Sequence, residues 1–292
     1  MKSVFKAILS ALLLIGVLSC TDSDQLPDPD FAPQNTKSTF STLNSPVVFI
    51  DEAHNNFLTK NGRFKPFSQV LSSDGYTVKS SKEKFTLTYL KQADILVVAN
   101  ALDRDRQDWS PPFGDAFDQE EIKALKQWVS QGGSLFLVAD HTPFPKVIEK
   151  ISFGFEFSNG HVRDALFRQD NKSLLQHSIT KGITQVKTFG GSAFQIPENA
   201  HPLLILGKGA TSVVPEIPFL VNAKTPRISV DGWYQGAVLE VGKGRVAVFA
   251  EGMMFSSQVT VSTGKKYGLV SVGAEQNEQF LLNIMHWLSK PI

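Results

Sequence analysis

Two Asp–His pairs directly follow predicted strands: Asp51 with His54, and Asp140 with His141. An imidazole oriented by a carboxylate is the usual general base, because its pKa lies near neutrality. Imidazole and carboxylate groups are also ligands that Zn²⁺ or Mn²⁺ accepts. The pairs therefore predict either metal-free acid–base chemistry or a site for a divalent metal. The alternative is structural, with each Asp capping the next turn and each His bonded to the backbone.

Other polar residues lie where strands end or in polar loops. Glu251 follows the apolar run 246–250 and is a candidate acid or ligand beside the two pairs. The candidate substrate contacts are Asn55, Asn100, His161, His177, Gln235 and Gln258. A solvated turn is the alternative for His161 and for His177. His286 lies beside Trp287 in a predicted helix and is expected to be structural.

Short apolar runs alternate with helical segments in the first half of the chain. Strands are predicted over 47–50, 76–78, 95–99 and 135–139, and helices over 64–72 and 117–130. Asp118 and Glu121 form a predicted capping box, and Gly132-Gly133 ends that helix. Apolar strands separated by helices indicate a parallel sheet covered on both faces. Because the carboxyl ends of parallel strands share one edge, the polar residues are expected to meet in one crevice.

The second half of the chain is less regular. The stretch 153–226 holds many Gly and Pro residues and is expected to form short strands and loops at one end of the sheet. The runs 238–241 and 246–250 flank Gly242-Lys243-Gly244, which predicts a β-hairpin. A helix over 274–289 closes the chain.

The first 20 residues indicate export from the cytoplasm. Lys2 and Lys6 accompany the apolar run 7–18, which is shorter than the about 20 residues that span a bilayer but long enough for a cleaved signal. The sequence Val17-Leu18-Ser19-Cys20 resembles a lipobox, which implies lipidation of Cys20; the alternative is an ordinary secretory signal in which the cysteine is incidental. We therefore expect a signal peptide over 1–19, a lipidated Cys with a flexible tether over 20–45, and a folded domain over 46–292. The expected location is the bacterial cell envelope, on the outer membrane, with its face left open.

Composition excludes several classes of function. Cys20 is the only cysteine, so the folded domain has neither an intramolecular disulfide nor a Cys nucleophile. The 29 Lys and Arg nearly balance the 28 Asp and Glu, so no basic field points to nucleic acid. The run 49–54 matches the acidic box of helicase ATPases, but no glycine-rich phosphate loop accompanies it, so a nucleotide is not expected.

Several motifs follow one another in a specific order along the chain. They are Asp51–Asn56, Gly132–Phe144, His177–Gly182, Gln235–Val238, Gly244–Glu251 with Met254, Phe255 and Gln258, and Gln276-Asn277. Over 46–289 they resemble the uncharacterised bacterial family DUF4350 of the class I glutamine amidotransferase-like superfamily. The resemblance implies a flavodoxin-like three-layer α/β sandwich with a mostly parallel sheet. It does not imply glutaminase activity, which needs a Cys nucleophile where this chain has Asp140-His141.

Two functions fit these observations. The first is a cell-envelope hydrolase for a carbohydrate or cell-wall derivative. Its water would be activated by a divalent metal or by an Asp-oriented His, with the two Asp–His pairs and Glu251 at the centre. The second is a non-catalytic protein that presents the polar crevice to a glycan or to an envelope protein. The expected location in the cell envelope is the only basis for a carbohydrate or cell-wall derivative as the substrate class.

Overall fold

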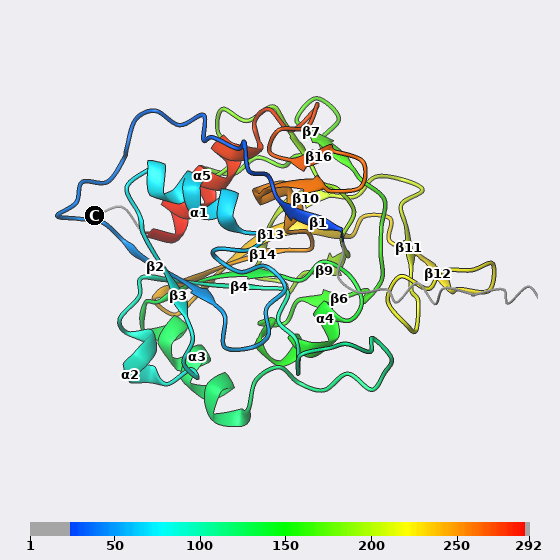
Figure 1. Cartoon of the computed structure of the whole chain (residues 1–292), viewed down its shortest axis with the longest axis horizontal. Helices are drawn as coiled ribbons and strands as arrows, with labels where there is room; N and C mark the ends of the chain where they lie inside the picture. The colour runs from blue at the N-terminus through cyan, green and yellow to red at the C-terminus, as the bar shows by residue number, and fades with distance from the viewer. Residues whose placement is uncertain (1–23, 290–292) are drawn as a thin grey trace, which may run out of the picture.

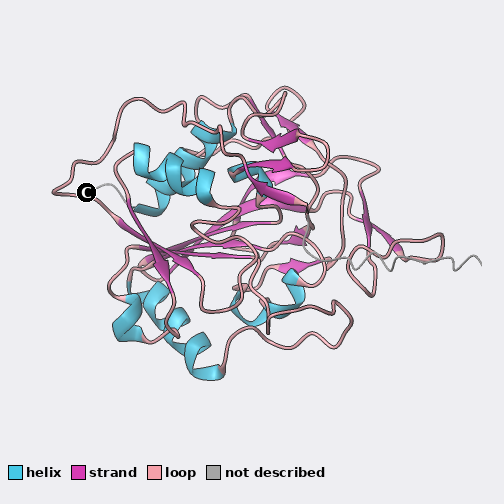
Figure 2. Ribbon diagram, viewed as in Figure 1, coloured by secondary structure: helices cyan, strands magenta, loops and turns pink. Residues whose placement is uncertain are grey.

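The computed structural model describes residues 24–289, so the predicted signal peptide and Cys20 lie outside the described residues. The chain forms three layers, with one large sheet between two layers of helices (Figure 1). Helices α1 (Lys65–Ser73) and α5 (Asn277–Ser289) cover one face. Helices α2 (Leu87–Leu90), α3 (Gln119–Gln131) and α4 (Phe144–Val147) cover the other (Figure 2). Within residues 24–289, no helix is long and apolar enough to cross a bilayer.

The large sheet has nine strands and is mixed. Its parallel strands, in spatial order, are β3 (Thr77–Ser81), β2 (Val47–Asp51), β4 (Ile95–Ala99), β5 (Ser134–Val138) and β14 (Gly244–Phe249). The antiparallel strands that continue it are β13 (Tyr234–Val241), β10 (His201–Ile205), β9 (Phe194–Gln195) and β6 (Glu156–Phe157). The prediction of a mostly parallel sheet is therefore wrong for the second half. There β13 turns into β14 through a short hairpin, which reverses strand direction, whereas a parallel pair needs a long crossover.

Side chains along each strand point alternately to the two faces of the sheet, so they contribute to a core on either side. Val48 and Phe136 point to the side of α1 and α5, whereas Phe49 and Leu135 point to the side of α3. The capping box at the start of α3 is confirmed, since the Asp118 carboxylate accepts the Glu121 N–H and the Glu121 carboxylate accepts the Asp118 N–H. This cap fixes the start of α3 close to the edge where the parallel strands end.

Short strands and loops make up most of 153–226, as predicted, and further short elements lie outside that stretch. Two small pairs are β7 (Leu166–Arg168) with β8 (Gln185–Lys187), and β11 (Thr211–Val213) with β12 (Arg227–Ser229). A third sheet joins β1 (Gln25–Pro27), β15 (Ser257–Thr260) and β16 (Lys265–Gly268). The 3₁₀ turns are η1 (Glu149–Ile151) and η2 (Met253–Phe255). The β11–β12 pair extends at one end of the long axis (Figure 1).

Residues 24–45 differ from the flexible tether expected there. Gln25–Pro27 adds a strand to β15, and Phe31 is buried in the core beneath α1 and α5. The backbone N–H groups of Gln34 and Asn35 both donate to the Glu278 carboxylate, each at 2.8 Å. The segment is fixed because carboxylates from distant parts of the chain satisfy its backbone, which its polar composition does not reveal.

Candidate functional site

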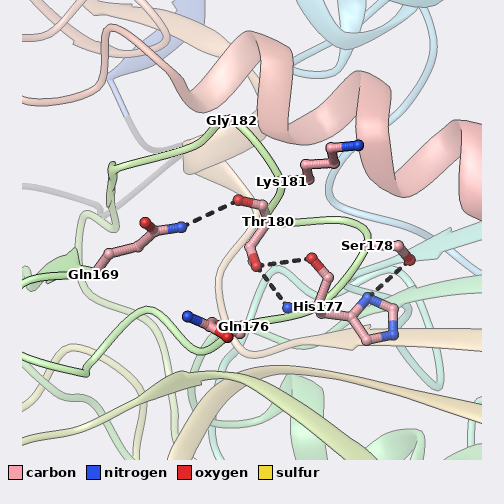
Figure 3. Close-up of a pocket in the computed structure, with 7 residues that line it drawn as sticks. All are labelled: Gln169, Gln176, His177, Ser178, Thr180, Lys181 and Gly182. Carbon is pink, nitrogen blue, oxygen red and sulfur yellow. Dashed lines mark hydrogen bonds between the residues drawn. The ribbon is translucent and has the colours of Figure 1, made fainter.

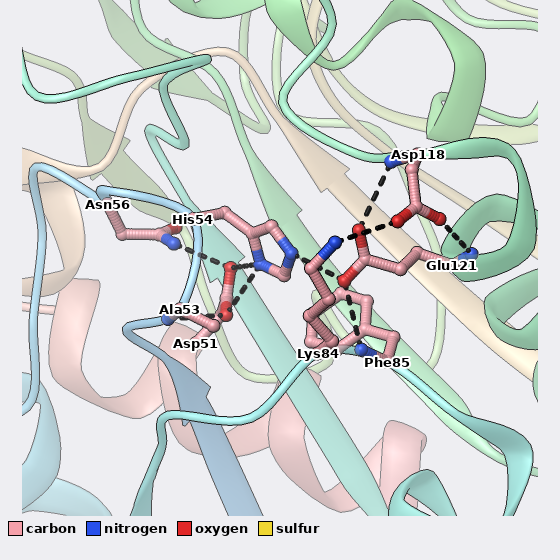
Figure 4. Close-up of polar contacts among 8 residues, drawn as sticks. All are labelled: Asp51, Ala53, His54, Asn56, Lys84, Phe85, Asp118 and Glu121. Carbon is pink, nitrogen blue, oxygen red and sulfur yellow. Dashed lines mark hydrogen bonds and ion pairs between the residues drawn. The ribbon is translucent and has the colours of Figure 1, made fainter.

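Asp51 and His54 belong to one buried group at the end of β2, together with Glu121 of α3 (Figure 4). The His54 Nδ1 lies 2.9 Å from Asp51 Oδ2, and its Nε2 lies 2.9 Å from Glu121 Oε1. The Asn56 side-chain amide donates to Asp51 at 2.5 Å, and the Phe85 N–H donates to Glu121 at 3.0 Å. We call this group the His54 cluster.

The environment of His54 favours its protonated form. Its ring lies between those of Phe85 and Phe117, at centroid distances of 4.6 and 4.3 Å. Burial alone would lower the pKa of His54, but hydrogen bonds and charges from Asp51 and Glu121 outweigh it and raise the pKa above its ordinary value. Both ring nitrogens are occupied by carboxylates. His54 therefore ties the loop after β2 to α3 and is not free to activate water or bind a metal.

Asp140 and Asn100 form a second polar group at the ends of β5 and β4. The Asn100 side-chain amide donates to Asp140 Oδ2 at 2.7 Å, and its Oδ1 accepts the Asp140 N–H at 3.0 Å. Asp140 Oδ1 is buried beside Gly252 without completing a hydrogen bond. Burial raises the pKa of Asp140 to about 6, against the opposing effects of the Asn100 amide, the nearby Gly252 N–H and the charge of His161.

Glu251 lies next to Asp140 because β14 is the neighbour of β5. The two strands run parallel, with Phe249 opposite Val138, so both acids leave the same edge of the sheet. Burial and then the charge of Asp140 raise the pKa of Glu251 to about 8. Its carboxylate accepts the N–H groups of Met253, Met254 and Phe189 at 2.6, 2.9 and 3.3 Å. Glu251 thus caps the η2 turn, and with a pKa of about 8 it is mostly protonated at pH 7 beside the ionised Asp140.

Two imidazoles complete the group that we call the Asp140 site. His141 Nδ1 donates to the Thr142 carbonyl at 3.0 Å, which leaves its Nε2 as an acceptor. The ring of His161 lies 5.7 Å from that of His141, between centroids, and His161 is exposed. Burial lowers the pKa of both imidazoles, and His141 lowers that of His161 further. Both rings are therefore neutral at pH 7 and able to exchange protons.

A glycine turn packs against this site. Gly190 and Gly191 have φ values of +116° and +85°. A Cβ on Gly190 would lie 2.7 Å from His161 Cε1, and one on Gly191 would lie 2.7 Å from the Glu251 Cβ. Gln235 is fully buried, and its amide donates to the carbonyl of Gly190 at 2.9 Å. Gln235 therefore shapes the turn from behind and does not reach a substrate directly.

The remaining predicted contacts lie elsewhere. His177 belongs to a separate pocket of about 520 Å³ (Figure 3), where its Nδ1 accepts the Ile179 N–H at 3.2 Å. Gln258 lies in β15, paired with Pro27 and Tyr267, and its buried Oε1 has no hydrogen-bond partner. Asn55 is exposed in a turn with φ +48°. Within residues 24–289, none of these three side chains is hydrogen-bonded to Asp140, His141, His161 or Glu251.

The structure therefore divides the two Asp–His pairs between two groups with different partners. Across residues 24–289, no group of three or more His, Cys, Asp or Glu residues is arranged to hold a metal ion. This differs from the expectation of one crevice that Asp51, His54, Asp140 and His141 share. Glu121, which bonds to His54, is not among the site residues predicted from the sequence. Its position in the capping box was the available signal, because it places that carboxylate at the sheet edge.

Comparison with known proteins shows likeness in fold only. No family model and no curated protein matches the chain. The mmIFT52 N-terminal domain is 16% identical, with a TM-score of 0.57 over 83% of this chain and 97% of that chain. A ThuA-like protein from Bacteroides uniformis is 14% identical, with a TM-score of 0.49 over 86% and 94%. A ThuA-like protein from Parabacteroides merdae is also 14% identical, with a TM-score of 0.46 over 84% and 90%. ThuA-like proteins belong to the class I glutamine amidotransferase-like superfamily.

Proposed function

We propose that the chain is a cell-envelope lipoprotein that hydrolyses a carbohydrate or cell-wall derivative at the Asp140 site. In this proposal its domain is a flavodoxin-like, class I glutamine amidotransferase-like domain of the DUF4350 group. The order of the motifs and the three-layer arrangement support the family and the fold. The chain has no cysteine in this domain, so glutaminase chemistry is not part of the proposal.

The observation that carries the proposal is the state of the Asp140 carboxyl. Its Oδ1 is buried without a hydrogen bond, and its pKa is raised to about 6. Leaving a buried polar atom unpaired costs stability, and such costs concentrate at functional sites. An acid with a pKa near 6 is ionised at neutral pH and is well matched to accept a proton.

The residues of the site take distinct roles in this hydrolysis. Asp140 accepts a proton from the attacking water, while Asn100 holds its other oxygen at 2.7 Å. His161, which is neutral and exposed beside it, relays that proton: one ring nitrogen accepts it from Asp140 while the other ring nitrogen releases its own proton to the oxygen that leaves. Glu251 acts as a positioning residue, because its oxygens hold the backbone of the turn that follows β14.

Exchange of Asp140 for Asn tests the hydrolysis. Asp140→Asn keeps the shape but removes the base, so release of reducing ends from polysaccharide and cell-wall fractions should fall about 100-fold or more. The wild-type rate should rise as the pH increases through about 6. Lys126→Gln, an exposed change on α3, is the matched control and should keep the full rate. Equal turnover by Asp140→Asn and wild type contradicts the proposal.

Lipidation is tested separately. β1 begins at Gln25, five positions after Cys20, so a lipid on Cys20 would place the folded domain close to the membrane. Cys20→Ser should move the full chain from the membrane fraction to the soluble fraction of cells. Retention in the membrane fraction contradicts the lipoprotein assignment without bearing on hydrolysis.

A non-catalytic binding protein is the second candidate. The favouring observation is that both nitrogens of His54 and both oxygens of Glu251 are held by structural hydrogen bonds. Only Asp140, His141 and His161 then remain for chemistry. This candidate predicts glycan affinity without turnover in every fraction tested.

A further inference from the structure

A pocket of about 750 Å³ lies beside the Asp140 site and shares His161 with it. Its walls come from the segment 161–165, the turn 206–211 and β12. The His161 N–H donates to the Val213 carbonyl at 2.7 Å, and the Val213 N–H donates back at 2.8 Å. Val213 in turn pairs with Arg227 across β11 and β12. Backbone pairing therefore places the ring of His161 and the side chain of Arg227 around one hollow.

Positive charge is concentrated in this pocket. Three cations line it, Arg163, Lys208 and Arg227, against the single acid Asp164. The whole chain has a net charge of only +1. Within the described residues, none of these three cations takes part in an ion pair, whereas cations elsewhere do, as Lys84 does with Asp118 and Lys150 with Asp115. Guanidinium and ammonium groups without partners are suited to carboxylates on a ligand.

The rest of the lining suits a sugar ring. Val162 and Leu206 are buried and provide an apolar floor, which the C–H face of a sugar can cover. The turn at Gly207 and Gly209 leaves the pocket open, because a Cβ at either position would meet nothing within 4 Å. A ligand that is apolar on one face and anionic at its edge fits this combination.

We propose that the pocket binds an oligosaccharide that carries carboxylate groups, next to the Asp140 site. The choice of a sugar over another anion rests on the proposed function, whereas the preference for negative charge rests on the three cations. His161 lines the pocket and also faces His141, so a chain of sugars bound there extends toward Asp140. The proposal thus names the substrate class of the same site.

Calorimetric titration of the full-length protein in detergent tests this binding. The probes are tetragalacturonate, which has a carboxylate on each ring, and its methyl ester, which has the same rings without charge. The double variant Lys208→Gln with Arg227→Gln should bind tetragalacturonate about tenfold or more weakly, and added salt should weaken wild-type binding. The control Lys126→Gln should bind within twofold of wild type. The disaccharide of N-acetylglucosamine and N-acetylmuramic acid, in a third titration, distinguishes a cell-wall carboxylate from a uronate.

Three results would overturn the proposal. They are equal binding of the methyl ester, equal loss of affinity in Lys126→Gln, and absence of binding by both acidic sugars at millimolar concentration. A further result would also overturn the proposal. If wild type binds no sugar but binds phosphatidylglycerol vesicles, and the double variant loses that vesicle binding, the cations contact a membrane surface. Asp140→Asn separates the two proposals. If it binds tetragalacturonate normally and no enzyme form releases reducing ends, the pocket stands and the hydrolysis fails.

Discussion

Asp51 and Asp140 both lie at the edge of one sheet where parallel strands end, yet their surroundings differ in one respect. Around Asp51, the imidazole of His54 is bonded at both nitrogens and the carboxylates have charged or polar partners. Around Asp140, one carboxylate oxygen is unpaired and two imidazoles are neutral. The same residue types thus satisfy one another in the His54 cluster and leave a buried carboxyl with a raised pKa in the Asp140 site.

Removal of His54 should have the largest effect on stability. His54→Ala leaves two buried carboxylates, Asp51 and Glu121, without the cation between them. Breaking a buried ion pair from one side costs about 3–5 kcal/mol. The midpoint of urea unfolding should fall accordingly. A loss below about 1 kcal/mol would show that water enters and replaces the imidazole, and the contrast between the two groups would then fail.

The pH dependence of that loss has a definite sign. The folded pKa of His54 lies above its unfolded value of about 6.5. Its contribution to stability is therefore complete below about pH 6.5 and is lost as the pH rises through the folded value. The difference in unfolding free energy between wild type and His54→Gln should shrink between pH 6.5 and 9. A difference that grows over this range contradicts an imidazolium between two carboxylates.

Asp140→Asn should stabilise the fold, by a smaller free energy than His54→Ala costs. The folded pKa of about 6 lies above the unfolded value of about 3.9, so ionisation in the folded state costs free energy. This cost is absent below about pH 4, grows up to about pH 6 and stays constant above. The variant should therefore gain up to about 3 kcal/mol at pH 8 and nothing at pH 4. Urea unfolding at the two pH values measures it, and a loss at pH 8 would assign Asp140 a structural role.

The first half of the fold could be predicted from sequence because its signals are local. Apolar runs of five residues mark β4 and β5, and the capping box marks α3. The proximity of Asp140 and Glu251 followed from strand ends alone. The antiparallel half could not be predicted in the same way. The hairpin of β13 and β14 was visible, but the pairing of β13 with β9 and β10 joins segments that no local pattern connects.

Long-range polar contacts account for the other differences. Glu121 is 67 positions from His54, so its role in that cluster is set by where α3 begins in space. Likewise, Gln34 is held by Glu278, which lies 244 positions away. The composition of 24–45 is polar and poor in apolar residues. It does not indicate which distant carboxylate accepts a hydrogen bond from each backbone N–H.

Lys84→Ala should have the smallest effect, although it also removes a cation beside the His54 cluster. Lys84 contacts Asp118 at 2.9 Å, but the two side chains are 75% and 49% exposed. Water and salt screen such a pair, so the urea midpoint should not shift measurably. The comparison with His54→Ala then isolates burial, because each change removes one positive charge near Glu121. If Lys84→Ala destabilises the fold as much as His54→Ala does, local charge balance stabilises this edge of the sheet, and the buried imidazole has no special role.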